Sequence, residues 1–146
     1  MAGGLSARLA AVVDALPLRP GMRVLEVGCG PGAAARAVAR RVAPGHVVAI
    51  DRSARAVQLA RRACADEIAA GLLDVRQSSI EDFSLEPGEP PFDLAFAVRV
   101  GALDGRHPAA GARALARLAS VLGPGGRLFV DGGDPLVEVE LHREGG

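Results

Sequence analysis

Apolar and polar positions along the chain change repeatedly between a strand-like and a helix-like spacing. Short apolar runs bounded by glycine, proline or charged residues predict five strands, over 23–27, 46–51, 72–77, 92–98 and 127–131. Apolar positions three or four residues apart predict helices over 5–16, 33–42, 53–67 and 108–122. A sixth strand fits residues 136–141, at an edge of the sheet where charged side chains would discourage aggregation.

Strands that alternate with helices predict a doubly wound, mainly parallel α/β sheet with right-handed crossovers and helices on both faces. The almost wholly apolar run 92–98 supports this fold, since it suits a strand covered on both faces. We expect one domain over 1–146, with an N-terminal helix within 1–20 and a short C-terminal strand and tail over 132–146. Ligands of such sheets bind at the carboxyl ends of the strands.

The composition is that of a folded domain without a nucleic-acid or membrane signature. Hydrophobic residues make up 49% of the chain, and 17 basic residues balance 17 acidic ones. A neutral domain lacks the basic surface typical of proteins that bind nucleic acids or anionic membranes. The helix over 5–16 contains Asp14 and no cleavage pattern follows it, so it does not resemble a signal peptide. We therefore expect a cytoplasmic domain with no nucleic-acid or membrane partner, and arginine pairs that form solvated helix faces.

Cysteine and histidine give no sign of a metal site. Cys29 and Cys64 are too few and too far apart for a zinc site or a disulfide scaffold. His46 and His142 have no partner at metal-ligand spacing. We interpret Cys29 as a small residue in a crowded loop and Cys64 as a buried helix residue, and we expect no metal.

The candidate chemistry lies in a glycine loop and in an acid about twenty residues after it. Gly28-Cys29-Gly30-Pro31-Gly32 follows the first strand, and Asp51 ends the second, as in the first half of a nucleotide-binding βαβ unit. The loop alone also fits the dinucleotide fingerprint, which leaves an NAD-dependent oxidoreductase open. Glu26 favours a cationic ligand instead, and Pro31 removes an N–H that a phosphate would use. Six strands also leave no room for the substrate domain of a typical dehydrogenase.

Together, these segments resemble the class I S-adenosylmethionine-dependent methyltransferases. The order and spacing match over 24–35, 48–51, 77–83, 92–98 and 118–130. The run Leu122-Gly123-Pro124-Gly125-Gly126-Arg127-Leu128 looks like the turn into the fifth strand of that family. The resemblance implies a Rossmann-like fold, S-adenosylmethionine as cofactor, and methyl transfer to an oxygen or nitrogen atom of a small-molecule acceptor.

The resemblance also implies which residues contact the cofactor. The glycine loop and Glu26 match the segment beneath the methionine part, and Asp51 matches the acid that accepts hydrogen bonds from the ribose. Ser79 borders the adenine, at a position where many members carry Asp. Arg99 matches the end of strand four, between cofactor and substrate. The implied cofactor-binding residues are Glu26, Gly28, Cys29, Gly30, Gly32, Asp51, Arg52, Ser79, Ile80, Val98 and Arg99.

Methyl transfer from a sulfonium needs an aligned acceptor, and a general base only if the acceptor must lose a proton. No catalytic motif is therefore required. His107 is a candidate base, although it could equally be a capping residue before Pro108. Arg99 could anchor a carboxylate or phosphate of the substrate, or it could pair with Asp104 or Glu81.

Two features leave the function open. A non-catalytic cofactor-binding subunit of a methyltransferase-like complex is an alternative to an active enzyme. Many family members continue after the fifth strand with a helix and an antiparallel pair of strands, whereas fifteen residues follow Asp131 here. We expect a substrate face that is open, that a second subunit completes, as in a homodimer, or that a further segment closes.

Overall fold

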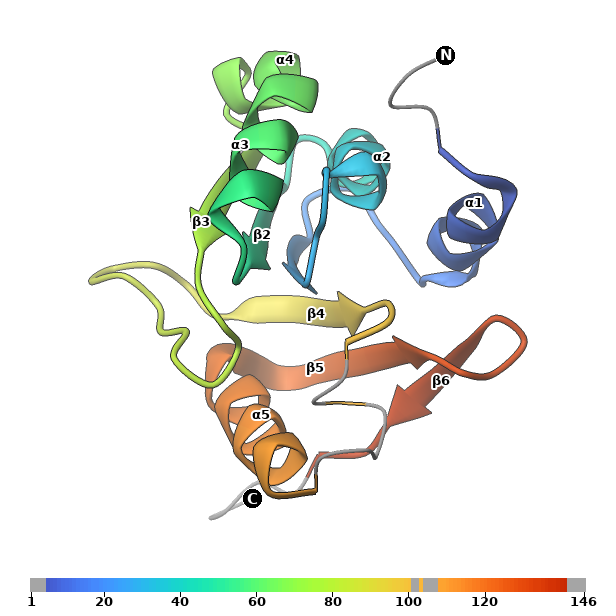
Figure 1. Ribbon diagram of the computed structural model, residues 1–146, viewed down its shortest axis with the longest axis vertical. Coiled ribbons are helices and arrows are strands. Elements are labelled where there is room, and N and C mark those ends of the chain that lie inside the picture. Colours follow the sequence, from blue (N-terminus) through green and yellow to red (C-terminus); the bar gives the residue numbers. More distant parts are fainter. Residues whose placement is uncertain (1–4, 101–102, 104–107, 142–146) are drawn as a thin grey trace.

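The computed structural model describes residues 5–100, 103 and 108–141, and shows strands that alternate with helices (Figure 1). The helices are α1 (Ala7–Ala15), α2 (Ala33–Val42), α3 (Ala54–Ala63), α4 (Ala65–Ala69) and α5 (Pro108–Val121). The strands are β1 (Arg23–Val27), β2 (His46–Asp51), β3 (Leu73–Gln77), β4 (Phe92–Ala97), β5 (Leu122–Asp131) and β6 (Leu136–Val139).

The strands form one sheet in the order β3-β2-β1-β4-β5-β6. Neighbouring strands from β3 to β5 are parallel, and β6 pairs with β5 in the antiparallel direction at the edge of the sheet. From β1 the chain adds β2 and β3 on one side, and it then adds β4, β5 and β6 on the other side, so the strand order switches between β1 and β4. The carboxyl ends of these two strands are the expected ligand-binding position. The predicted doubly wound α/β fold is thus confirmed.

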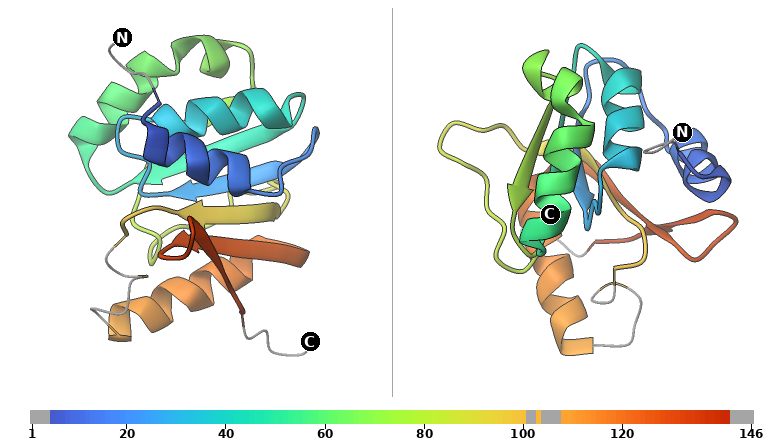
Figure 2. Two further views of the ribbon diagram at one scale, coloured as in Figure 1. Left: turned by 90° about the vertical axis from the view of Figure 1, so that its right-hand side faces the viewer. Right: turned by 45° about the horizontal axis from the view of Figure 1, so that its top comes forward.

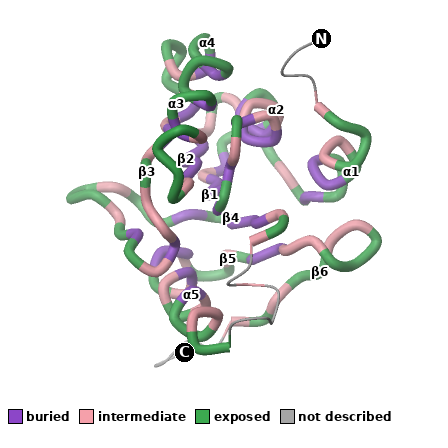
Figure 3. The backbone as a smooth tube through the Cα atoms, viewed as in Figure 1, coloured by how far each residue is buried: buried purple, intermediate pink, exposed green. Residues whose placement is uncertain are grey.

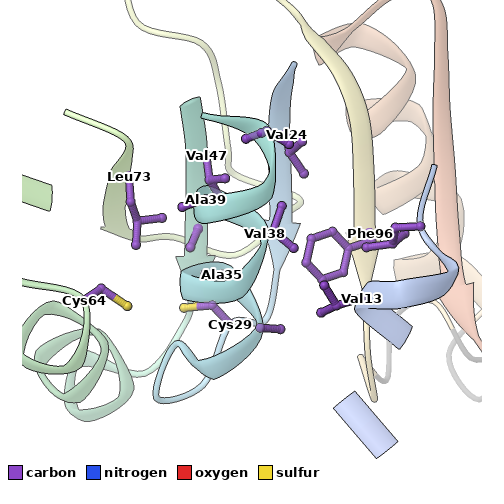
Figure 4. Packing of buried hydrophobic residues seen from close by; sticks show 14 of the residues in the cluster. Val13, Val24, Cys29, Ala35, Val38, Ala39, Val47, Cys64, Leu73 and Phe96 are labelled. Atoms are coloured by element: carbon purple, nitrogen blue, oxygen red, sulfur yellow. The ribbon is translucent and has the colours of Figure 1, made fainter. Parts of the chain in front are cut away.

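Helices cover both faces of the sheet (Figures 1 and 2). On one face, Val13 of α1 and Val38 of α2 belong to the same buried cluster as Phe96 of β4 (Figure 4). On the other face, Leu118 of α5 belongs to a second cluster with Leu25 of β1. The central strands are buried from both sides, as Figure 3 shows, and this accounts for their nearly continuous apolar sequence.

Two predicted boundaries are wrong. The helix expected over 53–67 is two helices, because Cys64 leaves the helical conformation with φ −104° and ψ 19°. The fifth strand begins at Leu122 instead of Arg127. Phe92 of β4 pairs with Leu122 and Leu94 pairs with Arg127, so the glycine-rich segment between them bulges out of the ladder.

The arginine pair on α2 is not a purely solvated face, which corrects the sequence interpretation. Arg36 and Arg40 donate hydrogen bonds to Glu67 of α4 at 3.3 and 2.9 Å, and the Glu67 side chain is only 4% exposed. Burial raises the pKa of Glu67, but the hydrogen bonds from Arg40 and Arg36 outweigh it and lower the pKa below 4.5. The break at Cys64 places α4 so that its carboxylate reaches α2.

Replacing Glu67 with glutamine should lower the free energy of unfolding by about 1–2 kcal/mol, since charge-assisted hydrogen bonds to half-exposed arginines are lost. The lowered pKa means that Glu67 stabilises the fold above its unfolded pKa, and that this contribution is lost as the pH falls below 4.5. Urea unfolding at pH 7 and pH 3.5 measures both effects. Glu140→Gln, at an exposed position, is the control. An equal stability of E67Q and E140Q at pH 7 would refute the role of Glu67.

Candidate cofactor and active site

Two adjacent cavities open at the carboxyl ends of the parallel strands. The first, here called the Asp51 cavity, has a volume of about 470 Å³ and is lined by the ends of β1 and β2 and the turn after β3. The second, the Glu26 cavity, has a volume of about 390 Å³ and lies among β1, the glycine loop and α1. Gly28 and Arg99 line both cavities, so the two meet at the switch point of the sheet.

Ten of the eleven site residues predicted from the sequence line one or both cavities. The Asp51 cavity is lined by Gly28, Asp51, Arg52, Ser79, Ile80 and Arg99 from that set. The Glu26 cavity is lined by Glu26, Gly28, Cys29, Gly30, Val98 and Arg99. Gly32 lines neither cavity. The strand ends therefore gather residues that lie far apart in the sequence, as a doubly wound sheet requires.

Hydrogen bonds to β2 hold the start of the glycine loop. The N–H groups of Gly28 and Cys29 both donate to the carbonyl of Ile50, at 2.8 and 2.9 Å. Gly28 has φ +74°, and a Cβ atom there would lie 2.8 Å from Cγ2 of Val100. Glycine therefore keeps the wall between the cavities thin, and a larger residue would push Val100 away.

Gly32 has a packing role at the start of α2. Its φ is +91°, and a Cβ atom would lie 2.9 Å from Sγ of Cys64 and 3.1 Å from Cβ of Ala60. The Cys64 thiol also approaches the carbonyl of Gly32, at 3.5 Å. This glycine thus allows close contact between α2 and α3.

Asp51 organises the loops on both sides of its cavity. One carboxylate oxygen accepts a hydrogen bond from the N–H of Gly30, and the other accepts one from the N–H of Ser53, each at 2.9 Å. Each oxygen of an ionised carboxylate has a second acceptor position. Asp51 can therefore order the loops and still accept hydrogen bonds from a ligand in the cavity.

Glu26 is a buried acid with an unused acceptor. Its side chain lines the Glu26 cavity and the residue is only 3% exposed. Among the residues that the structure describes, no group donates a hydrogen bond to Oε1. Burial raises the pKa of Glu26 well above 4.5, and the negative charge of Asp51 raises it further. A buried carboxyl oxygen without a partner is costly, and a cationic ligand in this cavity would satisfy it.

The geometry supports the structural interpretation of both cysteines. Burial, followed by the charges of Glu26 and Asp51, raises the pKa of the Cys29 thiol to about 12. Burial also raises the pKa of Cys64 to about 11. Both thiols stay protonated at neutral pH, which makes them poor nucleophiles. Figure 4 shows them within the core beside α2.

The turn after β3 forms the far wall of the Asp51 cavity. The hydroxyl of Ser79 donates to the carboxylate of Asp82 at 3.1 Å and accepts from the N–H of Asp82 at 3.2 Å. Ser79 therefore fixes this turn, and Ile80 is buried beneath the cavity. Arg52 lines the same wall, and its carbonyl accepts a hydrogen bond from Gln77.

Arg99 follows β4 in a strained conformation. Its φ is +58°, which costs a side-chain-bearing residue about 1–3 kcal/mol. Its N–H donates to one carboxylate oxygen of Asp131 at 3.0 Å, and the other oxygen accepts from the guanidinium of Arg8 at 3.0 Å. Asp131 thus ties the turn after β4 to α1.

Sequence reasoning missed Arg8 and Asp131 as site residues. Asp131 ends β5 at the ligand-binding edge of the sheet, and this position could have marked it. Arg8 carries no such signal, because only the packing of α1 brings it to the Glu26 cavity. The sequence left open an ion pair between Arg99 and Glu81. Both residues are described by the structure, and they form no ion pair with each other. Asp104 and the candidate base His107 lie outside the described residues.

The described part of the chain holds neither a cluster of metal ligands nor a membrane-spanning helix. Within residues 5–100, 103 and 108–141, no three His, Cys, Asp or Glu side chains gather as they would around a metal ion. Across the same residues, no helix has the length and apolar character needed to cross a membrane.

Comparison with known proteins agrees with this geometry. A sequence model of the methyltransferase domain matches residues 24–126, from β1 to the bulge in β5. This chain belongs to the class I S-adenosylmethionine-dependent methyltransferase family. The glycine loop, the acid that ends β2 and the turn after β3 all lie within the matched residues.

Individual members of the methyltransferase family resemble the chain over most of its length. A ubiquinone biosynthesis O-methyltransferase of Xylella fastidiosa is 40% identical over 124 residues, which cover 84% of this chain and 46% of the relative. Among solved structures, S-adenosylmethionine-bound CalS10, an amino pentose methyltransferase of Micromonospora echinaspora, superposes with a TM-score of 0.66 and 26% identity, over 84% of this chain and 48% of its own. The cyclase SpnF has a TM-score of 0.66 and 30% identity, over 84% of this chain and 42% of its own. The chain spans between 33% and 52% of the first three curated relatives.

Proposed function

We propose that this chain binds S-adenosylmethionine across the two cavities and transfers its methyl group to an oxygen or nitrogen atom of a small-molecule acceptor by in-line displacement. One observation carries the proposal. A buried acid with an unused oxygen, Glu26, lines one cavity, and a second acid, Asp51, lines the other. The two acids suit a ligand that has a cationic end and a pair of hydroxyl groups.

The cofactor fits this arrangement of residues. Its ammonium group would satisfy the unpaired oxygen of Glu26, and Asp51 has acceptor positions left for the two ribose hydroxyls. Arg52, Ser79 and Ile80 would border the adenine in the Asp51 cavity. A dinucleotide would instead place its pyrophosphate near Glu26, where the acid is unfavourable and Pro31 offers no N–H.

The residues of the chain would act mainly by positioning. When bound, S-adenosylmethionine supplies a methyl group on a positively charged sulfur atom. Gly28 and Arg99 line both cavities, so the acceptor would lie against the end of β4. Holding the acceptor in line there is an entropic contribution that needs no nucleophile from the protein. A general base would be required only for an acceptor that must lose a proton in the reaction.

The comparisons support an O-methyltransferase activity. The Xylella relative is named as an O-methyltransferase of ubiquinone biosynthesis. Incubation of the chain with S-adenosylmethionine and a panel of phenols, hydroxy acids and amines, followed by mass spectrometry of S-adenosylhomocysteine and the methylated product, tests the proposal. Product formation that depends on the acceptor supports it. Binding of the cofactor without transfer to any acceptor would contradict the catalytic part.

A second candidate is cofactor binding without methyl transfer. The similar structure of SpnF is described as a cyclase, so the fold is compatible with another reaction. Saturable binding of S-adenosylhomocysteine together with the absence of turnover, or a stable complex with another chain, would favour this alternative.

Glu26→Gln should abolish a proton release that accompanies cofactor binding. Because burial raises the pKa of Glu26, the free chain keeps this acid protonated above pH 4.5, and a bound ammonium group would favour its ionised form. Wild-type binding should therefore release a proton and strengthen as the pH rises above 4.5, within the range below the usual α-amino pKa. Calorimetry in two buffers of different ionisation enthalpy counts the protons. An equal release by the wild type and E26Q would contradict the role of Glu26.

A further inference from the structure

We propose that the acceptor is an acid and that Arg99 binds its carboxylate. This inference rests on the proposed function, since it concerns the molecule that receives the methyl group. Arg99 lines both cavities at the point where they meet, and its side chain is exposed. A guanidinium group at this place would be next to the acceptor.

The guanidinium group of Arg99 has no partner in the part of the chain that the structure describes. Within residues 5–100, 103 and 108–141, it forms no hydrogen bond and no ion pair. The neighbouring acid, Asp131, does not pair with it: one oxygen of Asp131 accepts the N–H of Arg99 and the other binds Arg8. The carboxylate of Asp131 thus fixes the backbone of Arg99 without binding its guanidinium group.

The sulfonium group of the cofactor gives no reason for a cation at the end of β4. S-adenosylmethionine carries its positive charge on the sulfur atom next to the transferred methyl group, and a second cation beside it is unfavourable unless an anion binds between or near them. Arg99 also occupies a left-handed conformation, with φ +58°, that arginine rarely adopts. Strained backbone at a binding site is typical of a residue that is held there for its function, and binding an anionic acceptor would be such a function.

A carboxylate fits better than a phosphate. One guanidinium group binds one carboxylate through two parallel hydrogen bonds. A phosphate dianion would need a further cation, but Arg8 is already paired with Asp131. Asp51 and Glu81, which line the Asp51 cavity, would also repel a dianion more strongly than a monoanion.

The test measures the binding of benzoate and of its neutral counterpart, benzamide, to the chain saturated with S-adenosylhomocysteine. Asparagine tolerates the left-handed conformation, so Arg99→Asn removes the charge without adding backbone strain. Arg99→Lys keeps the charge, and Arg55→Gln removes an exposed charge of α3 outside both cavities. We expect the wild type to prefer benzoate, R99N to bind it about 10- to 100-fold more weakly, R99K to lie between them, and R55Q to match the wild type.

The outcomes separate this inference from the proposed function. If the wild type does not bind S-adenosylhomocysteine, the proposed function itself fails. If it binds the cofactor product but shows no preference for benzoate, or if R99N keeps that preference, the inference about Arg99 is overturned and the cofactor site stands. If R99N loses S-adenosylhomocysteine affinity by the same factor, Arg99 serves the carboxylate of the cofactor, which also overturns the inference.

Discussion

Asp51→Ala is expected to weaken the binding of S-adenosylhomocysteine by about 1–3 kcal/mol, or about 5- to 150-fold in the dissociation constant. The variant removes the acceptors proposed for the ribose hydroxyls. It also releases the N–H groups of Gly30 and Ser53, both of which donate to this carboxylate at 2.9 Å. The loss of these two loop contacts therefore lowers the affinity further, in addition to the loss of the direct ligand contacts. Isothermal titration calorimetry of the wild type and the variant measures the change.

Two further variants separate binding from folding. Asp51→Asn keeps one acceptor oxygen for the loop but loses the charge, so its affinity should lie between those of the wild type and D51A. Asp66→Ala removes an exposed acid of α4 and should bind as the wild type does. Urea unfolding of each variant checks that the fold is intact at the temperature of the titration. A folded D51A chain with unchanged affinity would disprove the proposed ribose contact.

Gly32→Ala is expected to lower the free energy of unfolding by about 2–5 kcal/mol. A left-handed alanine costs about 1–2 kcal/mol, and forcing apart a packed contact costs a further 1–3 kcal/mol or so. The added Cβ atom would lie 2.9 Å from Sγ of Cys64 and 3.1 Å from Cβ of Ala60, so α2 and α3 must separate. Urea unfolding followed by circular dichroism measures the loss.

Gly71→Ala is the matched control for this experiment. Gly71 has φ +77°, but a Cβ atom there would meet nothing within 4 Å. The control should therefore lose only the conformational part, about 1–2 kcal/mol. If G32A and G71A are destabilised equally, the close contact between α2 and α3 contributes nothing, and the packing role assigned to Gly32 is wrong.

The sequence predicts the first half of the fold well because its signals there are local. The bounds of β1, α2 and β2 agree with the prediction, since glycine or proline residues bound β1 and α2, and β2 lies between Gly45 and the N-cap Ser53. The break at Cys64 has no such signal. It depends on contacts of Cys64 with Gly32 and of Glu67 with Arg36 and Arg40, which join segments about 30 residues apart.

In the candidate site, too, the sequence predicts some residues and not those that depend on contacts between distant segments. The glycine loop, Asp51 and the turn after β3 could be predicted, because a parallel sheet brings the carboxyl ends of its strands together. The contact between Arg8 and Asp131 could not, because it depends on how α1 packs across the end of β5. The strained backbone of Arg99 is likewise absent from the sequence pattern, since arginine at this position suggests no left-handed turn.

Calorimetric titration of the purified chain with S-adenosylhomocysteine, with NADH titrated in parallel, tests the central claim most directly. We predict saturable binding of one S-adenosylhomocysteine per chain, weakened in D51A, and no saturable binding of NADH. Binding of NADH in preference to S-adenosylhomocysteine, or binding of neither ligand by the folded chain, would contradict the assignment of the two cavities to the cofactor.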